Sequence, residues 1–200
     1  MNDLVVKGIG YLDWGPFSFE VGAGECLGVT GDSGSGKSLL LRALADLDPN
    51  TGQVLLGETE RTAVPAPEWR RRIGMLPAET EWWYDTVGEH FEPIDGALLQ
   101  SLGLSAALMP VLPGQLSAGE RQRLAVLRLL SRQPRALLLD EPSANLDADN
   151  TRKLEDLIAS YRSRHQAPVI WISHDTDQIP RVADRHLRMH DRQLTPVEMP

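Results

Sequence analysis

The chain has 200 residues, a length that suits one domain, or one domain with a small lobe, and is enough to bury a sizeable core. Its formal net charge of −8 disfavours a protein that wraps nucleic-acid backbone. The single cysteine, Cys26, excludes an internal disulfide framework, and no apolar run approaches the roughly 20 residues that span a bilayer.

Short strand-like segments open the chain. Residues 4–6 and 17–21 are expected to form strands, with Tyr11 and Trp14 in the connection between them. Residues 26–30 are short and apolar and predict a buried strand, and residues 38–46 predict a helix.

Between that strand and that helix lies a glycine-rich segment that fits the pattern G-x-x-x-x-G-K-[ST] without a mismatch. It consists of Gly31, Asp32, Ser33, Gly34, Ser35, Gly36, Lys37 and Ser38. In a strand–loop–helix context the backbone N–H groups of such a loop surround the β-phosphate, and the helix N-terminus adds partial positive charge. Lys37 can reach the β- and γ-phosphates, and the Ser38 hydroxyl can ligate Mg²⁺. An ordinary glycine turn would explain neither residue, so the segment predicts a nucleoside triphosphate site.

The middle of the chain changes character. Residues 53–56 and 73–76 predict strands, with a short basic turn at 68–72 between them. From about 77 to 116, aromatic residues, prolines and short helical patches predict a small helical subdomain. Trp82, Trp83 and Tyr84 lie in it, and they suit a partner surface and the lobe's own core about equally.

The last third alternates helices with strands. Ser117 and Glu120 form a capping box that predicts a helix start. The apolar run 136–139 predicts a strand buried on both faces that ends at Asp140 and Glu141, and the strand 169–172 ends near His174. Alternating strands and helices predict an α/β fold with a mostly parallel sheet, whose ligands lie at the carboxyl ends of the strands.

Three side chains at those strand ends suit phosphoryl chemistry. Asp140 is placed to hold Mg²⁺ opposite Ser38, and Glu141 can polarise a water for attack on a γ-phosphate. His174 could contact the γ-phosphate and the attacking water. Alone, each has a structural explanation; together with the phosphate loop they form a candidate catalytic set.

Five motifs occur in a fixed order: GDSGSGKS at 31–38, LSAGERQR at 116–123, LLLDEP at 137–142, SANLD at 143–147, and His174. In this order the chain resembles the nucleotide-binding subunit of an ABC transporter over essentially its full length. The resemblance implies one ABC ATPase domain over residues 1–200: a phosphate-loop NTPase core, N-terminal antiparallel strands and the helical subdomain at about 77–116.

The resemblance also implies roles and partners. Two subunits, as a homodimer or heterodimer, would pair head-to-tail around two ATP molecules, with Ser117 and Gly119 of one subunit closing over the nucleotide on the other's phosphate loop. Asp147 would lie at the dimer seam, and Leu39 would contribute its backbone N–H near the α-phosphate. Tyr11 is the first candidate to stack on adenine and Trp14 the second. A separate transmembrane permease would hold the subunit at the inner face of the cell membrane, in the cytoplasm, and no nucleic acid is expected.

Three positions depart from the family pattern. Ala78 stands where a glutamine usually meets Mg²⁺ and the attacking water, with Glu79 as a neighbouring carboxylate; Leu39 replaces a threonine, and Ala118 replaces a glycine. Two alternatives remain beside a transport ATPase, the second of them motivated by Ala78. One is a soluble ABC-type ATPase of DNA repair or translation, and the other is a regulatory module that binds ATP but hydrolyses it weakly.

Overall fold

The computed structural model describes residues 2–92 and 96–199, and its first layer is an antiparallel sheet. This sheet has the strand order β2-β1-β4-β5. Its members are β1 (Leu4–Tyr11), β2 (Trp14–Val21), β4 (Thr51–Leu56) and β5 (Thr59–Glu60). The N-terminal antiparallel strands of the expected fold are thereby confirmed, and both β1 and β2 run further than the sequence indicated.

The second layer is a mostly parallel sheet with the order β10-β9-β3-β8-β7-β6. Its members are β3 (Cys26–Gly31), β6 (Ile73–Leu76), β7 (Ala136–Asp140), β8 (Val169–Ile172), β9 (Arg185–His190) and β10 (Gln193–Val197). Only the edge strand β10 pairs antiparallel, with β9. The parallel strands β3, β8 and β7 are neighbours, which brings together the ends at which the candidate site residues were predicted.

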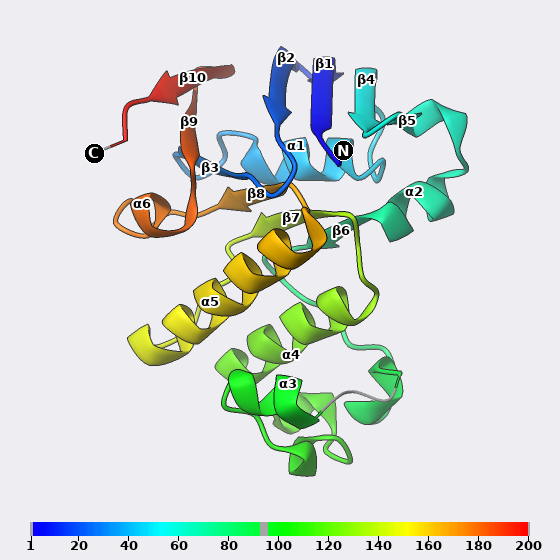
Figure 1. Cartoon of the computed structure of the whole chain (residues 1–200), viewed down its shortest axis with the longest axis vertical. Helices are drawn as coiled ribbons and strands as arrows, with labels where there is room; N and C mark the ends of the chain where they lie inside the picture. Colours follow the sequence, from blue (N-terminus) through cyan, green and yellow to red (C-terminus); the bar gives the residue numbers. More distant parts are fainter. Residues whose placement is uncertain (1, 93–95, 200) are drawn as a thin grey trace.

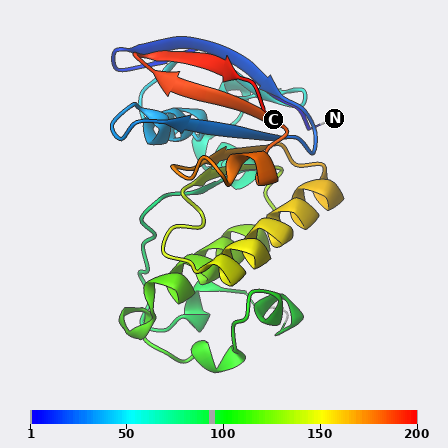
Figure 2. The same ribbon diagram turned by 90° about the vertical axis from the view of Figure 1, so that its left-hand side faces the viewer.

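Helices cover both faces of the parallel sheet, as Figures 1 and 2 show. Helix α1 (Lys37–Leu44) lies between the two sheets, whereas α4 (Ala118–Ser131) and α5 (Ala148–His165) pack on the opposite face. The remaining helices are α2 (Ala66–Arg72), α3 (Gly96–Ser101) and α6 (Ile179–Val182). No helix in residues 2–92 and 96–199 combines the length and the apolar character needed to cross a bilayer.

Strand β7 shows why the parallel sheet is stable between these layers. Ala136 and Leu138 belong to the core shared with α1, and Leu137 and Leu139 to the core shared with α4 and α5. Successive side chains of a strand point to opposite faces, so an uninterrupted apolar run is what a doubly covered strand requires. The prediction of a strand buried on both faces is confirmed.

Two local expectations are corrected. Residues 66–72 form the helix α2 rather than a basic turn, because the buried indole of Trp69 anchors it by donating from Nε1 to the carbonyl oxygen of Leu44 (2.9 Å). Tyr11 and Trp14 are not in a connection: Tyr11 ends β1, Trp14 begins β2, and the two face each other across a two-residue turn.

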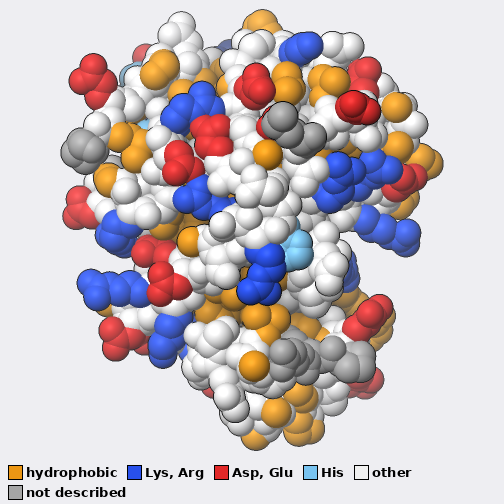
Figure 3. All heavy atoms as spheres, in the orientation of Figure 1, with side chains coloured by type: hydrophobic (Ala, Val, Ile, Leu, Met, Phe, Trp, Pro, Cys, Tyr) orange, Lys and Arg blue, Asp and Glu red, His pale blue; other side chains and the backbone are white. Residues whose placement is uncertain are grey.

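In the described parts of the small lobe, residues 77–92 and 96–116, there are one short α-helix, α3, and three single 3₁₀ turns, at Gly88–His90, Ala106–Leu108 and Pro113–Gln115. Its buried residues Val87, Leu99 and Leu102 join the core under α4. In Figure 3 hydrophobic side chains gather on the lower lobe, whereas charges of both signs spread over the upper part of this face.

Candidate functional site

The phosphate loop connects the carboxyl end of β3 to the first turn of α1. Gly36 is the N-cap of α1 with φ of 94°, a left-handed conformation that glycine adopts without steric cost. A Cβ atom there would lie 3.0 Å from the Trp14 ring. No side chain caps α1, and its first turn has no acidic residue. Its N–H groups are therefore available to an anion, which the helix dipole favours.

Lys37 is buried and lies back over the loop. Its ammonium group donates hydrogen bonds to the carbonyl oxygens of Gly31 (2.8 Å) and Asp32 (2.9 Å). Burial lowers the pKa of Lys37, although the carboxylates of Glu141, Asp140 and Asp32 act in the opposite direction. The other predicted phosphate-binding residues belong to the same loop and the helix start, namely Ser33, Gly34, Ser35, Ser38 and Leu39, with the Ser38 side chain exposed.

Asp140 and Glu141 lie at the carboxyl end of β7, as the apolar run predicted. Asp140 is the last residue of the strand and only 3% exposed. Glu141 begins the next turn with φ of 49°, and its N–H donates to the carbonyl oxygen of Ile172 on β8 (3.1 Å). Burial raises the pKa of the Glu141 carboxyl, although His174 and Lys37 nearby favour its ionised form. A carboxyl with a raised pKa is suited to accept a proton from water.

His174 is brought to Glu141 by the loop after β8. Its Nε2 atom lies 3.4 Å from Oε1 of Glu141. That oxygen is buried and has no hydrogen-bond partner among the described residues. A buried acceptor without a partner is costly unless something binds to it. The pair can thus hold a water or a phosphate oxygen between the ends of β7 and β8.

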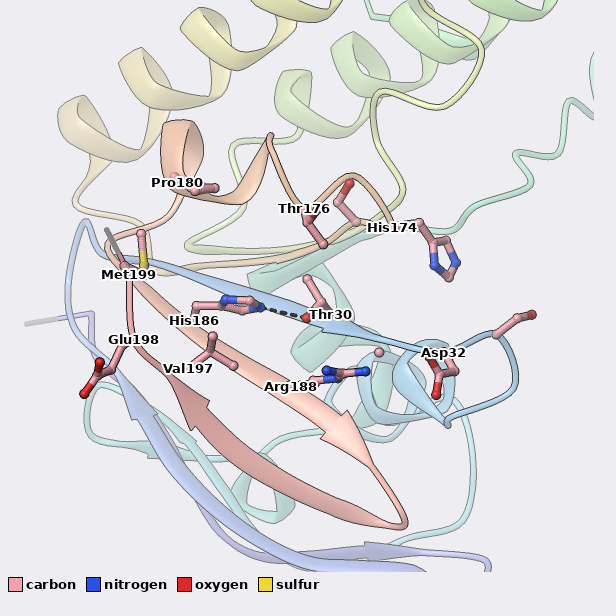
Figure 4. Close-up of a pocket in the computed structure, with 13 residues that line it drawn as sticks. Thr30, Asp32, His174, Thr176, Pro180, His186, Arg188, Val197, Glu198 and Met199 are labelled. Carbon is pink, nitrogen blue, oxygen red and sulfur yellow. Dashed lines mark hydrogen bonds between the residues drawn. The ribbon is translucent and has the colours of Figure 1, made fainter.

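A cavity of about 650 Å³ opens beside the phosphate loop. Figure 4 shows His174 on one side of it, His186 and Arg188 of β9 on the other, and Asp32 of the phosphate loop near its end. Oγ1 of Thr30 lies 2.7 Å from Nε2 of His186, and this contact joins β3 to β9 at the wall of the cavity. The phosphate loop and His174, 136 residues or more apart in sequence, therefore border one space.

Of the two aromatic candidates for adenine, the structure favours Trp14. Tyr11 is only 4% exposed, and its hydroxyl donates to the carbonyl oxygen of Gly36 (3.2 Å), so its ring offers no free face to a base. Trp14 is half-buried against Gly36 and lines a cavity of about 460 Å³ together with Asp32–Ser35 and His190–Arg192. The burial of Tyr11 argues against the stacking role expected of it.

The predicted capping box is present at the start of α4. Oγ of Ser117 accepts from the N–H of Glu120 (3.2 Å), while the N–H of Ser117 donates to the Glu120 carboxylate (2.9 Å). The Ser117 hydroxyl also donates to this carboxylate (2.7 Å), and that hydrogen bond, together with the one from the Ser117 N–H, lowers the pKa of Glu120. A Cβ atom at Gly119 would lie 3.3 Å from the carbonyl oxygen of Asn145, so the first turn of α4 packs closely on the segment after Glu141.

Ala78 and Ala118, two of the departures from the family pattern, share a cavity of about 450 Å³. Gln122 and Glu79 also line it. Ala78 and Glu79 are exposed, whereas Gln122 is buried and bonds to the turn after β7. This contact of Gln122 was not predicted; its one signal in the sequence is a polar residue on a helix face that is otherwise apolar.

The donor set suits a nucleotide with a magnesium ion. Ser38 supplies an exposed hydroxyl and Asp140 a carboxylate at a strand end, and oxygen donors of this kind are what Mg²⁺ prefers. Among the described residues no group of three or more histidines, cysteines or acids could form an all-protein metal cage. Mg²⁺ held by one or two protein oxygens and by phosphates needs no such cage.

Comparison with known proteins identifies similar chains. A family model described as ABC transporter matches residues 15–144. The chain is 38% identical over 180 residues to the aliphatic sulfonates import ATP-binding protein SsuB 3 of Paraburkholderia xenovorans (strain LB400), covering 88% of this chain and 70% of that protein. It is 36% identical over 178 residues to Protein STAR1 of Oryza sativa subsp. japonica, covering 82% and 51%.

A third relative, ABC transporter I family member 17 of Arabidopsis thaliana, is 33% identical over 196 residues, covering 92% of this chain and 74% of that protein. The chain thus spans between about half and three quarters of the length of these relatives. Among solved structures, a bacterial Atm1-family ABC exporter with ATP bound superposes with a TM-score of 0.85 at 23% identity, over 97% of this chain and 38% of that one. At this identity the likeness establishes the fold.

Proposed function

The chain belongs to the ABC transporter family as an ATP-binding domain, and on that premise we propose that it hydrolyses ATP to power a membrane transporter through a separate permease chain. One observation carries the proposal. At the carboxyl ends of the parallel strands the structure brings together the phosphate loop, Asp140, Glu141 and His174. Membership of the family establishes the ATP-binding fold, and the side chains at these strand ends are suited to hydrolysis.

In this proposal each side chain has one task. The N–H groups of the loop and the ammonium of Lys37 bind the phosphates, and Trp14 contacts the adenine. Mg²⁺, when bound at Ser38 and Asp140, would neutralise charge on the phosphates. Glu141 accepts the proton of the attacking water, and His174 holds the water or a phosphate oxygen beside it.

The signature segment is assigned to a second subunit. Helix α4 packs on the face of the main sheet opposite to α1, so Ser117 and Gly119 are poorly placed to cover the phosphate loop of their own chain. We propose that they cover the loop of a partner in a head-to-tail dimer, with Asp147 at the seam. Asp147 caps α5 by accepting from the N–H of Asn150 (2.8 Å), which fixes the exposed segment before it.

The names of the relatives favour transport over a role in DNA repair or translation, since the bacterial relative is named an import ATP-binding protein. By that analogy the subunit works at the inner face of the cell membrane. An ATPase assay of the purified chain tests hydrolysis: with Mg²⁺ we expect steady release of phosphate that stops when EDTA removes the metal. ATP binding without phosphate release would instead support the regulatory module that Ala78 suggested.

The adenine contact can be separated from the phosphate contacts. Trp14→Ala is expected to weaken ATP binding about tenfold, because stacking on an aromatic contributes about 1–3 kcal/mol per base. Binding of inorganic triphosphate, which has no base, should stay within twofold of wild type. Calorimetry with both ligands checks this, and Tyr11→Phe is the control expected to keep normal ATP affinity. Equal losses for the two ligands would contradict a base contact.

The three adjacent aromatics of the small lobe divide between core and surface. Trp82 is half-buried and packs against the core under α4, whereas Trp83 and Tyr84 are 56% and 51% exposed. The Arg128 guanidinium lies over both tryptophan rings, 4.4 Å from that of Trp82 and 4.7 Å from that of Trp83. His90 accepts the N–H groups of both exposed aromatics, at 2.9 and 3.0 Å, and so fixes their backbone. Large exposed aromatics on a fixed backbone suit an interface with the permease.

Trp83→Ala is therefore expected to leave the melting temperature and the basal ATPase rate unchanged while weakening binding to the co-expressed permease at least tenfold. Trp82→Ala is the matched control, and it should lower the melting temperature by several degrees because it removes buried packing. Co-purification from detergent-solubilised membranes measures the association. Undiminished association after replacement of both Trp83 and Tyr84 would rule out docking at this site.

A further inference from the structure

The backbone of Glu141 is held in an unusual conformation. Its φ of 49° lies in the left-handed region, which residues with a side chain seldom occupy and which persists only where the surroundings enforce it. On one side its N–H is fixed to β8 through the carbonyl oxygen of Ile172. On the other side its own carbonyl oxygen accepts from the N–H of Ala144 (3.1 Å), which closes the turn.

A side chain from another element completes this hold. Gln122, in the second turn of α4, is only 5% exposed. Its Nε2 donates to the carbonyl oxygens of Glu141 (3.3 Å) and Pro142 (3.0 Å). An amide nitrogen has two hydrogens, so both are used on consecutive carbonyls of the same turn. The direction in which the Glu141 carboxylate leaves the backbone is thus set from α4.

The same helix meets this segment at a second point. The close approach of Gly119 to Asn145 joins the first turn of α4 to the residues after the turn. The start of α4 therefore contacts residues 141–146 at two points, through the hydrogen bonds of Gln122 and through the close packing at Gly119. A shift of α4 would therefore be transmitted to Glu141.

We propose that Gln122 is a positioning residue that orients Glu141 for attack on the γ-phosphate and ties that orientation to the position of α4. The proposal rests on the proposed function. In the head-to-tail dimer α4 also carries Ser117 and Gly119, which cover the partner's nucleotide. Each Glu141 is then joined through Gln122 to the surface that contacts the ATP of the other site.

Gln122→Met tests the proposal, because methionine keeps the length and volume of glutamine but cannot donate a hydrogen bond. With the purified full chain, we expect kcat for ATP hydrolysis to fall at least tenfold while KM and the dissociation constant for ATP stay within twofold of wild type. Hydrogen exchange of the Ala144 amide should become faster, since the turn loses the two hydrogen bonds that Gln122 donates to it.

Gln178→Met is the matched control. Gln178 is equally buried, at 1% exposure, but bonds to side chains, those of Ser143, Glu155 and Trp171, and not to the backbone of Glu141. Its replacement should lower the melting temperature without lowering kcat of the folded protein. If Gln122→Met does not fold, Gln122→Glu, which keeps the shape and also lacks the two N–H groups, replaces it with the same expectation.

A normal kcat in folded Gln122→Met or Gln122→Glu protein would overturn the positioning role, even if the melting temperature fell. Equal losses of kcat in the Gln122 and Gln178 variants would overturn it too, since a general loosening of the core would explain both. These results are distinct from failure of the proposed function, which would show as absence of hydrolysis in the wild-type chain.

Discussion

Glu141→Gln is expected to lower the rate of ATP hydrolysis by about 100-fold or more and to leave ATP binding intact. General-base catalysis by a positioned carboxylate contributes about 10²–10⁴-fold, and the amide cannot accept the proton of the attacking water. The amide has nearly the same shape, so the contacts of the site with His174 and with the strand ends are kept. Phosphate release at saturating ATP measures the effect.

The same variant should trap the proposed dimer. If ATP lies between two subunits and is no longer cleaved, the dimer persists, and gel filtration with ATP and Mg²⁺ should show a shift from monomer to dimer. Glu79→Gln is the control, since Glu79 is exposed beside Ala78. This variant should neither lower the hydrolysis rate nor trap a dimer. A Glu141→Gln protein that stays monomeric and hydrolyses ATP at the wild-type rate would remove Glu141 from the catalytic role.

The predictable part of this structure is the part whose signals are local. The capping box needs only the spacing of Ser117 and Glu120, and it forms as predicted. The β7 strand needs only an apolar run between polar ends, and it places Asp140 and Glu141 at the expected edge. The alternation of strands and helices then predicted an α/β fold with a mostly parallel sheet, in which the carboxyl ends of the strands lie on one side.

Other elements depend on neighbours that are distant in sequence. Strand β9 has only one buried residue, Met189, and its charged sequence gives no strand pattern; pairing with β3 makes it a strand. Tyr11 was predicted to lie in the connection between two short strands, but β1 and β2 both extend to this point and the Tyr11 ring packs in the core between the sheets. The contact of Gln122 with the turn after β7 depends on the packing of α4 against that turn, which no local sequence pattern predicts.

Lys37→Met is expected to reduce ATP affinity by at least 100-fold. Lys37 is the only basic residue of the loop at 31–38, so the variant leaves no side-chain cation there to meet the phosphates. Methionine keeps most of the length and volume of the side chain, so the loss reports the charge and its hydrogen bonds rather than the space they fill. Calorimetric titration with ATP measures the affinity directly.

The same substitution should not destabilise the fold. Burial lowers the pKa of Lys37 despite three nearby carboxylates, which means that the protein alone disfavours the charge at this position. An unfavourable charge that is nevertheless present suggests a role toward a ligand of opposite charge. The melting temperature without nucleotide should therefore be retained, whereas the rise that saturating ATP causes in the wild type should vanish, since that rise follows the ratio of ATP concentration to dissociation constant. A variant that unfolds without ligand, or that is still stabilised by ATP as the wild type is, would show that Lys37 serves the loop and not the nucleotide.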